Sequence, residues 1–337
     1  MTPRAFDNAI RVLSATGGST NEFIHLVAIA VRLAIRLGLD RFAAIGEQTP
    51  QVLGVRPSGP FSLEDFDHAG GVPALLAVLE PLLESGCVVG DGRTVAEVCA
   101  AVRAATPRPH PCLRSLDDPF EPKSGLVVLR GSLAPRGAIF KRSAAPRKLW
   151  THRGPAVVFD YHTAHERAAD PGLHATPDSV IVLRNAGPVG APGMPEIDFV
   201  PIPAVLRKAG ITEVVCVTDG RMSGTEGGAT ALHVTPEAAA GGPSDSSTTA
   251  MRSSSTPRPA HSICSSTTTS SPAEPPKPRP TPPQPAAATS GSTSSTSCNP
   301  TRAATWTSWS ITANTNSLAN FDFLLAGAPT LAPQNFK

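Results

Sequence analysis

The chain has 337 residues, 17% of them charged, with 29 basic and 27 acidic side chains and a net charge of +2. This balance excludes a strong electrostatic case for nucleic-acid binding, which needs a basic patch or stripe. The most apolar stretch, residues 23–39, contains His25, Arg32 and Arg36, which are costly inside a bilayer. We therefore expect no membrane span and no signal peptide, and a cytoplasmic location.

Helical periodicity dominates residues 1–111, which we assign to one domain. Ala5 to Leu13 place apolar side chains on one helical face, and a second helix is expected to follow the polar residues 19–21 and to run to Leu33. Further helices are predicted over Val72–Glu84, with Pro73 in the first turn, and over Thr94–Ala105.

Short β-branched runs separated by Gly or Pro take over from residue 112 to residue 243. We expect helices at His162–Ala169 and Pro203–Ala209 among them. The predicted fold class is α/β: the trailing helices of an α/β/α domain, an incomplete β-barrel-like domain with flanking helices, and then a tail. The predicted strands are Leu126–Arg130, Ala138–Lys141, Ala156–Asp160, Val180–Leu183 and Val214–Thr218.

The composition changes near Pro243. Residues 1–243 contain 11 serines, whereas 48 of the last 94 residues are Ser, Thr or Pro. A segment of this kind has too little apolar surface to offset the entropy of ordering it. We predict that residues 244–337 form a disordered, low-complexity tail and that any function lies before it.

Several motifs in the first 243 residues occur together and in a fixed order. They resemble those of the dihydroxy-acid dehydratase and phosphogluconate dehydratase family, and within it the sugar-acid (aldonate) dehydratases. The motifs are Ala-Phe-Asp-Asn-Ala-Ile at 5–10, Gly-Gly-Ser-Thr-Asn at 17–21, Pro-Ser-Gly at 57–59, residues 64–73, residues 125–135, Gly-Met-Pro-Glu at 193–196 and Thr-Asp-Gly-Arg-Met-Ser-Gly at 218–224.

The resemblance implies dehydration of a 2,3-dihydroxy acid to a 2-keto acid, with an iron–sulfur cluster and Mg²⁺ as cofactors. Hydroxide is a poor leaving group and the α-proton is weakly acidic, so such a site needs a Lewis acid, a second metal and a base. The substrate would be a small dihydroxy acid, either a sugar acid or a branched-chain acid. The intact family member is expected to be a homo-oligomer.

The resemblance assigns two residues to the chemistry. Glu196 matches the magnesium ligand, on a loop stiffened by Pro192 and Pro195, although a lone loop glutamate is more often simply solvated. Ser223 matches the catalytic base, a serine acting as its alkoxide, which requires positive potential nearby. The alternative for Ser223 is a plain helix cap.

Four polar residues are candidates for binding the substrate. Ser19, Thr20 and Asn21 can donate hydrogen bonds to a carboxylate or hydroxyl, but they can equally cap the helix that follows, and capping is favoured. Arg221 belongs to the same motif as Ser223 and is the fourth candidate.

Six scattered cysteines form no Cys-x-x-Cys pair and are expected to be buried, reduced thiols. In the family, the cluster-binding cysteines come from motifs that precede the Gly-Gly-Ser-Thr-Asn segment. No cysteine precedes Gly17 in this chain, so we assign no iron–sulfur ligand here and expect the chain to begin within a domain. Two readings stay open: a dehydratase inactive as this chain alone, or a non-catalytic fragment or pseudogene product. The cysteines are Cys87, Cys99, Cys112, Cys216, Cys264 and Cys298.

The tail admits a second explanation, from the genetic code. If the Ser, Thr and Pro codons are TCN, ACN and CCN, a reading frame that starts one base earlier changes what they encode. Ser codons then encode Val, Leu, Ile or Phe, Thr codons encode Asp, His, Asn or Tyr, and Pro codons encode Ala, Pro, Ser or Thr. Around Trp306, whose codon is unique, this frame permits Asp-Leu-Asp-Phe-Leu-Val, which resembles the family's C-terminus. We predict a single-base frameshift near residues 242–244; a genuine Ser/Thr/Pro-rich linker or stalk is the alternative.

Overall fold

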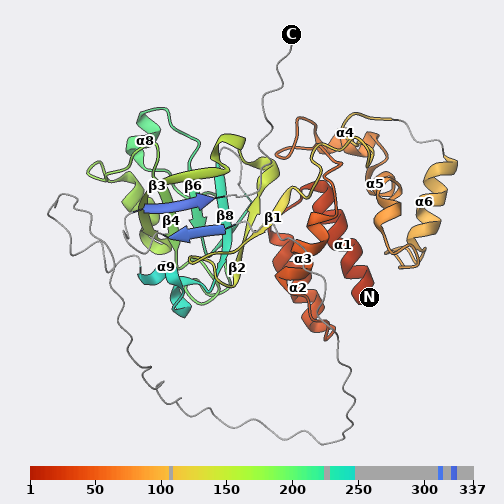
Figure 1. Ribbon diagram of the computed structural model, residues 1–337, viewed down its shortest axis with the longest axis horizontal. Coiled ribbons are helices and arrows are strands. Elements are labelled where there is room, and N and C mark those ends of the chain that lie inside the picture. The colour runs from red at the N-terminus through yellow and green to blue at the C-terminus, as the bar shows by residue number, and fades with distance from the viewer. Residues whose placement is uncertain (106–108, 224–227, 247–309, 314–319, 325–337) are drawn as a thin grey trace, which may run out of the picture. The chain divides into compact units, whose positions relative to one another are not determined.

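The computed structural model describes residues 1–105, 109–223, 228–246, 310–313 and 320–324. The helices of residues 1–105, which Figure 1 shows in red and orange, are joined by loops. A short 3₁₀ turn, Glu80–Leu82, follows the fifth helix. The helices are α1 (Pro3–Thr16), α2 (Asn21–Arg32), α3 (Leu39–Glu47), α4 (Leu63–His68), α5 (Gly71–Leu79) and α6 (Val95–Ala104).

Capping residues define the ends of these helices. Thr2 caps α1 by accepting a hydrogen bond from the Ala5 N–H at 3.3 Å, and Gly17 ends α1 in the left-handed region at φ +54°. Helix α6 starts with a capping box in which Thr94 and Glu97 satisfy each other's backbone N–H groups.

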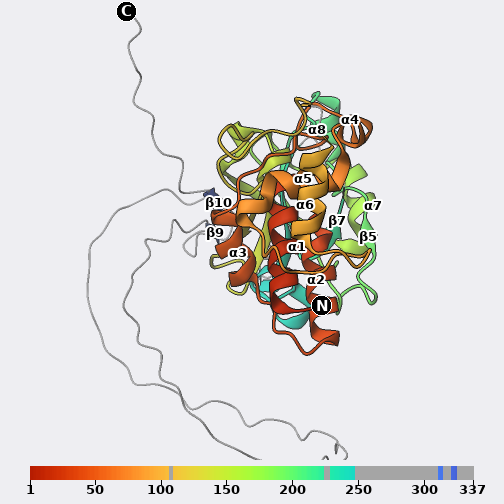
Figure 2. The same cartoon turned by 90° about the vertical axis from the view of Figure 1, so that its right-hand side faces the viewer.

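Two apolar clusters hold the helical part together. In one, Ile10 of α1 and Ile45 of α3 pack with Leu126 and Ile139 of the sheet. In the other, α1, α5 and α6 lie side by side (Figure 2) around buried Leu75, Leu79 and Cys99. The first cluster is the packing that joins the helices to the sheet.

In the described residues the strands form an eight-stranded mixed sheet in the order β1-β2-β8-β6-β4-β3-β10-β9, plus a separate two-stranded pair, β5-β7. Strands β3, β4, β6 and β8 are parallel in register, and the outer pairings are antiparallel. The bounds are β1 (Leu126–Leu129), β2 (Gly137–Lys141), β3 (Thr151–Asp160), β4 (Val180–Arg184), β5 (Glu196–Ile197), β6 (Val215–Thr218), β7 (Arg221–Met222), β8 (Ala229–Thr235), β9 (Ser310–Ala313) and β10 (Asn320–Leu324).

Both faces of the central strands are buried. Val180 and Val182 of β4 pack into one apolar cluster, and Ile181 and Leu183 pack into another, as strand alternation requires. Helices α7 (Ala164–Ala169) and α8 (Ala204–Lys208) contribute to the second cluster. Strands covered on both faces read as continuous apolar runs, which is why they were recognisable in the sequence.

The α/β class is confirmed, whereas the finer expectation of a barrel is not. No pairing in the described part of the chain joins β1 to β9, so the sheet is open there. All four predicted helices in residues 1–105 and all five predicted strands are present, as are α7 and α8. Helices α3 and α4 and strands β5, β7 and β8 were not predicted.

The structure describes only a few residues of the predicted tail, 244–246, 310–313 and 320–324. Helix α9 (Pro243–Ser246) and strands β9 and β10 are formed, and β10 pairs antiparallel with residues 151–155 of β3. Alternation of polar with β-branched or aromatic residues in 310–313 and 320–324 favours strands locally. The rest of the predicted tail lies outside the described residues. Within those residues, no helix is long and apolar enough to cross a membrane.

Candidate active site

Two buried carboxylates fix the loop that leads from β4 to Glu196. Asp219 accepts three backbone hydrogen bonds and Glu237 accepts two, so the course of residues 185–190 is set by side chains outside the loop. Burial raises the pKa of Asp219 against the opposing effect of these N–H donors. The donors are the N–H groups of Asn185 (3.1 Å), Ala186 (2.9 Å) and Ala238 (2.9 Å) for Asp219, and of Val189 (3.0 Å) and Gly190 (3.1 Å) for Glu237.

Glu196 lies at the centre of a polar cluster. Strand β5 pairs in parallel with β7, which places Glu196 opposite Arg221. An Arg221 guanidinium nitrogen lies 3.3 Å from Glu196 Oε2, and the Asn21 amide donates to both carboxylate oxygens at 3.2 and 3.0 Å. The Glu196 side chain remains 31% exposed. Three of the residues singled out in the sequence therefore meet, from α2, β5 and β7.

Arg221 is held from a second direction as well. Its Nε donates to the Met194 carbonyl at 2.6 Å, and Met194 adopts φ +46°, an uncommon left-handed conformation for a residue with a side chain. The guanidinium thus bridges the loop before Glu196 and the carboxylate itself. This geometry makes Arg221 a structural partner of Glu196.

Thr20 is almost fully buried, and its hydroxyl donates to the Met222 carbonyl at 3.3 Å. It makes no side-chain capping hydrogen bond to α2, so the capping prediction is wrong for Thr20. Ser19 does serve the helix start, because its Oγ accepts from the Asn21 N–H at 3.2 Å. Thr20 instead fastens the beginning of α2 to β7, 202 residues away.

Ser223 is exposed in the bend after β7 and lines a cavity of about 320 Å³. Ser19 and Thr20 line the same cavity, together with Arg56 and Lys141. The lining contains two cations and, among the described residues, no carboxylate. Positive potential around Ser223 is the condition that an alkoxide base requires.

Gly17, the first residue of the Gly-Gly-Ser-Thr-Asn motif, lines this cavity at a position that favours glycine. It combines φ +54° with close packing: a Cβ atom there would lie 2.8 Å from Ser143 Oγ and 2.9 Å from Ser58 Oγ. These two hydroxyls lie 2.8 Å apart, and Ser58 also donates to the Gly17 carbonyl at 2.9 Å. The motif therefore lies where three chain segments, around residues 17, 58 and 143, contact one another.

Gly17→Ala is expected to lower the free energy of unfolding by about 2 kcal/mol. The left-handed conformation costs a side chain about 1 kcal/mol, and overpacking against two fixed hydroxyls adds at least as much. Urea unfolding measures the effect. Gly86→Ala is the control, because its Cβ would meet nothing within 4 Å; equal losses for the two variants would contradict this account of Gly17.

His233 is a feature of this region that sequence reasoning missed. It adopts φ +55° where the register of β8 against β2 shifts, and its N–H donates to the Gly220 carbonyl at 3.1 Å. Burial, and to a lesser extent the charge of Arg221, lower the pKa of His233 to about 4. A β-bulge beside a polar cluster often redirects a side chain, but a single histidine in a strand carries no such signal in the sequence.

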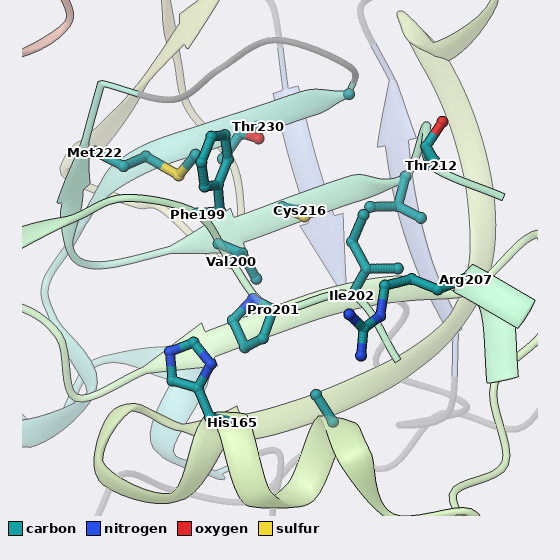
Figure 3. A pocket seen from close by; sticks show the side chains of 13 residues that line it. His165, Phe199, Val200, Pro201, Ile202, Arg207, Thr212, Cys216, Met222 and Thr230 are labelled. Atoms are coloured by element: carbon teal, nitrogen blue, oxygen red, sulfur yellow. The ribbon is translucent and has the colours of Figure 1, made fainter. Parts of the chain in front are cut away.

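A second cavity, of about 400 Å³, is lined by residues that follow β5 and by residues of α7, β6, β7 and β8 (Figure 3). Phe199, Val200 and Met222 form much of its wall, and Cys216 lies in it. None of the residues predicted for the chemistry lines it. Burial raises the pKa of Cys216 to about 12, so this thiol is protonated near neutral pH.

The described cysteines do not fit an iron–sulfur cluster. Cys99, Cys112 and Cys216 are buried in three different apolar clusters, and Cys87 packs beside the first of these. Burial raises the pKa of Cys99 and Cys112 as well. In the part of the chain that the structure describes, no three His, Cys, Asp or Glu side chains are grouped so as to hold a metal ion.

Glu196 fits Mg²⁺ as a single ligand. Magnesium is commonly bound by one or two carboxylates and completes its shell with water and substrate oxygens. The partly exposed carboxylate of Glu196 meets that requirement, provided that Arg221 yields part of its contact. Asn21 would still orient the carboxylate through the remaining oxygen.

Comparison with known proteins identifies the family of this chain. Residues 1–98 match the family model "Dihydroxy-acid/6-phosphogluconate dehydratase N-terminal", and residues 111–245 match the corresponding C-terminal model. The chain is 45% identical over 252 residues to 6-deoxy-6-sulfo-D-gluconate dehydratase of Pseudomonas putida and 45% identical over 248 residues to L-arabonate dehydratase of Azospirillum brasilense. It is 43% identical over 245 residues to dihydroxy-acid dehydratase of Ignicoccus hospitalis.

These matches cover 72% of this chain and 42 to 44% of the relatives, so the chain spans less than half of their length. All three relatives are dehydratases, the class of hydro-lyases that remove water from a substrate. The chain belongs to the dihydroxy-acid/6-phosphogluconate dehydratase family.

Proposed function

We propose that this protein is a hydro-lyase that converts a 2,3-dihydroxy acid, preferably a sugar acid, to a 2-keto acid. The observation that best supports the proposal is that Asn21 and Arg221 both contact Glu196, beside a cationic cavity that Ser223 lines. Two of the relatives, at 45% identity, are named for sugar acids, which favours that substrate class.

The reaction would proceed by loss of the C2 proton and the C3 hydroxyl. Ser223, as its alkoxide, takes the C2 proton, and the C3 hydroxyl leaves as hydroxide, which takes that proton from Ser223 to become water. The resulting enol gains a solvent proton at C3 and loses the proton of its C2 hydroxyl to solvent, which gives the 2-keto acid. Arg56 and Lys141 line the cavity of Ser223 and favour its anionic form. Asn21 and Arg221 hold the Glu196 carboxylate in one orientation. When bound, Mg²⁺ would neutralise the developing enolate charge.

The proposal includes an iron–sulfur cluster as Lewis acid, but the described cysteines offer no site for one. We therefore propose that this chain alone is inactive. A cytoplasmic location and a homo-oligomer also remain part of the proposal, on the family resemblance.

The second candidate is a non-catalytic fragment that retains Glu196 and Ser223 only as relics. The ion pair between Arg221 and Glu196 favours this candidate, because the guanidinium already neutralises the carboxylate. Iron and sulfide analysis of the purified chain, together with a semicarbazide assay for keto acids, tests the chain directly. A bound cluster with keto-acid formation would contradict our proposal that the chain alone is inactive.

The catalytic roles proposed for Ser223 and Glu196 can be tested in a protein that also contains the cluster ligands, which the described residues of this chain do not provide. We define the chimera as L-arabonate dehydratase of A. brasilense in which residues 1–243 of this protein replace the matching segment. Dehydration of L-arabonate by the chimera would support the catalytic assignment. Failure of the chimera, with a folded protein and an active parent enzyme, would favour the non-catalytic candidate.

We further propose that the residues after about 243 are an out-of-frame translation. The family match ends at residue 245, next to the change in composition. Sequencing the gene is expected to show that the frame one base earlier encodes Asp-Leu-Asp around Trp306 and strand-like runs upstream of it. A shifted frame without these patterns would leave the Ser/Thr/Pro-rich linker as the explanation.

A further inference from the structure

The second cavity, the one that Cys216 lines, takes no part in the proposed dehydration. No residue lines both this cavity and the cavity of Ser223. Its volume of about 400 Å³ falls within the range of sites for small ligands. It is therefore a separate candidate site, and its lining determines which class of ligand would fit.

The interior of this cavity is apolar. Val200, Val214 and Met222 line it, and each of them is at most 5% exposed. Cys216 and Thr230 are the buried polar side chains of the lining, and they share a hydrogen bond. Polar groups that already have each other as partners do not need a polar ligand, so the interior favours an apolar one.

The other end of the cavity carries nitrogen donors. His165 of α7 and Arg207 of α8 are exposed residues of the lining. Figure 3 shows these two side chains on the lower side of the cavity, with Phe199, Met222 and Thr230 above them. Phe199 is itself 60% exposed, so a ligand would also cover apolar surface that now faces water. The lining thus suits a ligand with one polar and one apolar end.

The guanidinium of Arg207 sets the charge of the polar end. Among the described residues, none forms an ion pair with it, and no carboxylate lines the cavity. Glu166 and Asp198 adjoin lining residues along the chain but do not line the cavity themselves. Glu213, in the segment that enters β6, pairs with Lys148 instead. The positive charge is therefore available to an anion.

We propose that this cavity binds an aliphatic monocarboxylate, with its carboxylate at Arg207 and its hydrocarbon chain against Val200, Val214 and Met222. A guanidinium matches a carboxylate through paired N–H donors, and the imidazole of His165 adds a donor at the same end. A sugar acid does not suit this interior, because its hydroxyls would be buried without partners. The ligand therefore belongs to a different class from the proposed substrate.

NMR of the methionine methyl groups in the full 337-residue chain tests this site, because Met222 lines the cavity whereas Met1 and Met194 do not. The Met222→Leu variant identifies the Met222 signal. Octanoate is expected to shift this signal saturably and to leave the Met1 and Met194 signals in place. It should bind about 10-fold more tightly than hexanoate, because each buried CH₂ group contributes about 0.8 kcal/mol.

Octylammonium, which has the same chain with the opposite charge, should bind at least about 5-fold more weakly than octanoate. Arg207→Gln should bring the two affinities within about 2-fold by weakening octanoate, and should keep the effect of chain length. Lys208→Gln is the matched control, because Lys208 is the next residue of α8, is also exposed and does not line the cavity. It should keep the preference for octanoate.

Absence of a saturable shift of the Met222 signal with octanoate would overturn the site. Equal shifts of the Met1, Met194 and Met222 signals would also overturn it, because they would indicate detergent-like binding over the whole surface. Equal affinities of the wild-type chain for octanoate and octylammonium would overturn the contact between the carboxylate and Arg207, and with it the proposed class of ligand.

Discussion

Replacing Ser223 with alanine in the chimera is expected to reduce kcat for dehydration at least about 100-fold, because a positioned base contributes a factor of that order or more. Ser223 is exposed in the bend after β7 and lines a cavity that contains two cations and no described carboxylate. Alanine removes the oxygen and leaves the cations, so binding of the substrate should change little. The expected signature is a large fall in kcat with KM within about 3-fold of the unsubstituted chimera.

Ser85→Ala is the matched control, because Ser85 is also exposed and lies outside the cavity. It should leave both constants unchanged. If Ser223→Ala retained near-normal kcat, the base would have to be another group. If KM rose while kcat held, Ser223 would be a binding residue.

The second large effect concerns His233, which is expected to make the free energy of unfolding depend on pH. The pKa of His233 is about 4 in the folded protein, whereas an ordinary histidine has a value near 6.5. The unfolded chain therefore binds a proton that the folded protein excludes between these values. Stability contributed by the neutral imidazole is full above about pH 6.5 and is lost as the pH falls towards 4, by about 3 kcal/mol in all.

His233→Asn tests this expectation, because asparagine tolerates the left-handed conformation and does not titrate. Urea unfolding at pH 7, 5.5 and 4 should show a smaller acid-induced loss for the variant, by about 3 kcal/mol. His25→Asn, at an exposed position on α2, should keep the wild-type pH dependence. Identical profiles for the wild-type chain and His233→Asn would show that this imidazole does not couple folding to pH.

Much of the fold was predictable because its strongest patterns are local. The apolar face of α1, the capping box of α6 and the apolar runs of β4 and β6 are each visible within about ten residues. Strands β5 and β7 were missed because they have only two residues each. They form by pairing with each other across 25 positions of sequence, and no local pattern records that contact.

The sequence motifs predicted which residues belong to the candidate site, but not the contacts between those residues. Glu196, Asn21 and Arg221 were each named from a motif, but no motif indicated that their side chains contact one another, and Thr20 joins α2 to β7 instead of capping the helix. The carboxylate of Asp219 stands in a recognised motif, yet its role in fixing residues 185–186 depends on backbone N–H groups over thirty positions away. Contacts of this kind follow from tertiary packing, so they needed the structure.

The most direct measurement of the central claim is NMR of the products that the chimera forms from L-arabonate in D₂O, after reconstitution with iron, sulfide and Mg²⁺. We predict a 2-keto acid with one deuterium at C3, because the enol left by loss of the C2 proton and the C3 hydroxyl takes its new proton from solvent. Unchanged L-arabonate, with a folded chimera and an active parent enzyme under the same conditions, would contradict the assignment of residues 1–243 to a dehydratase site.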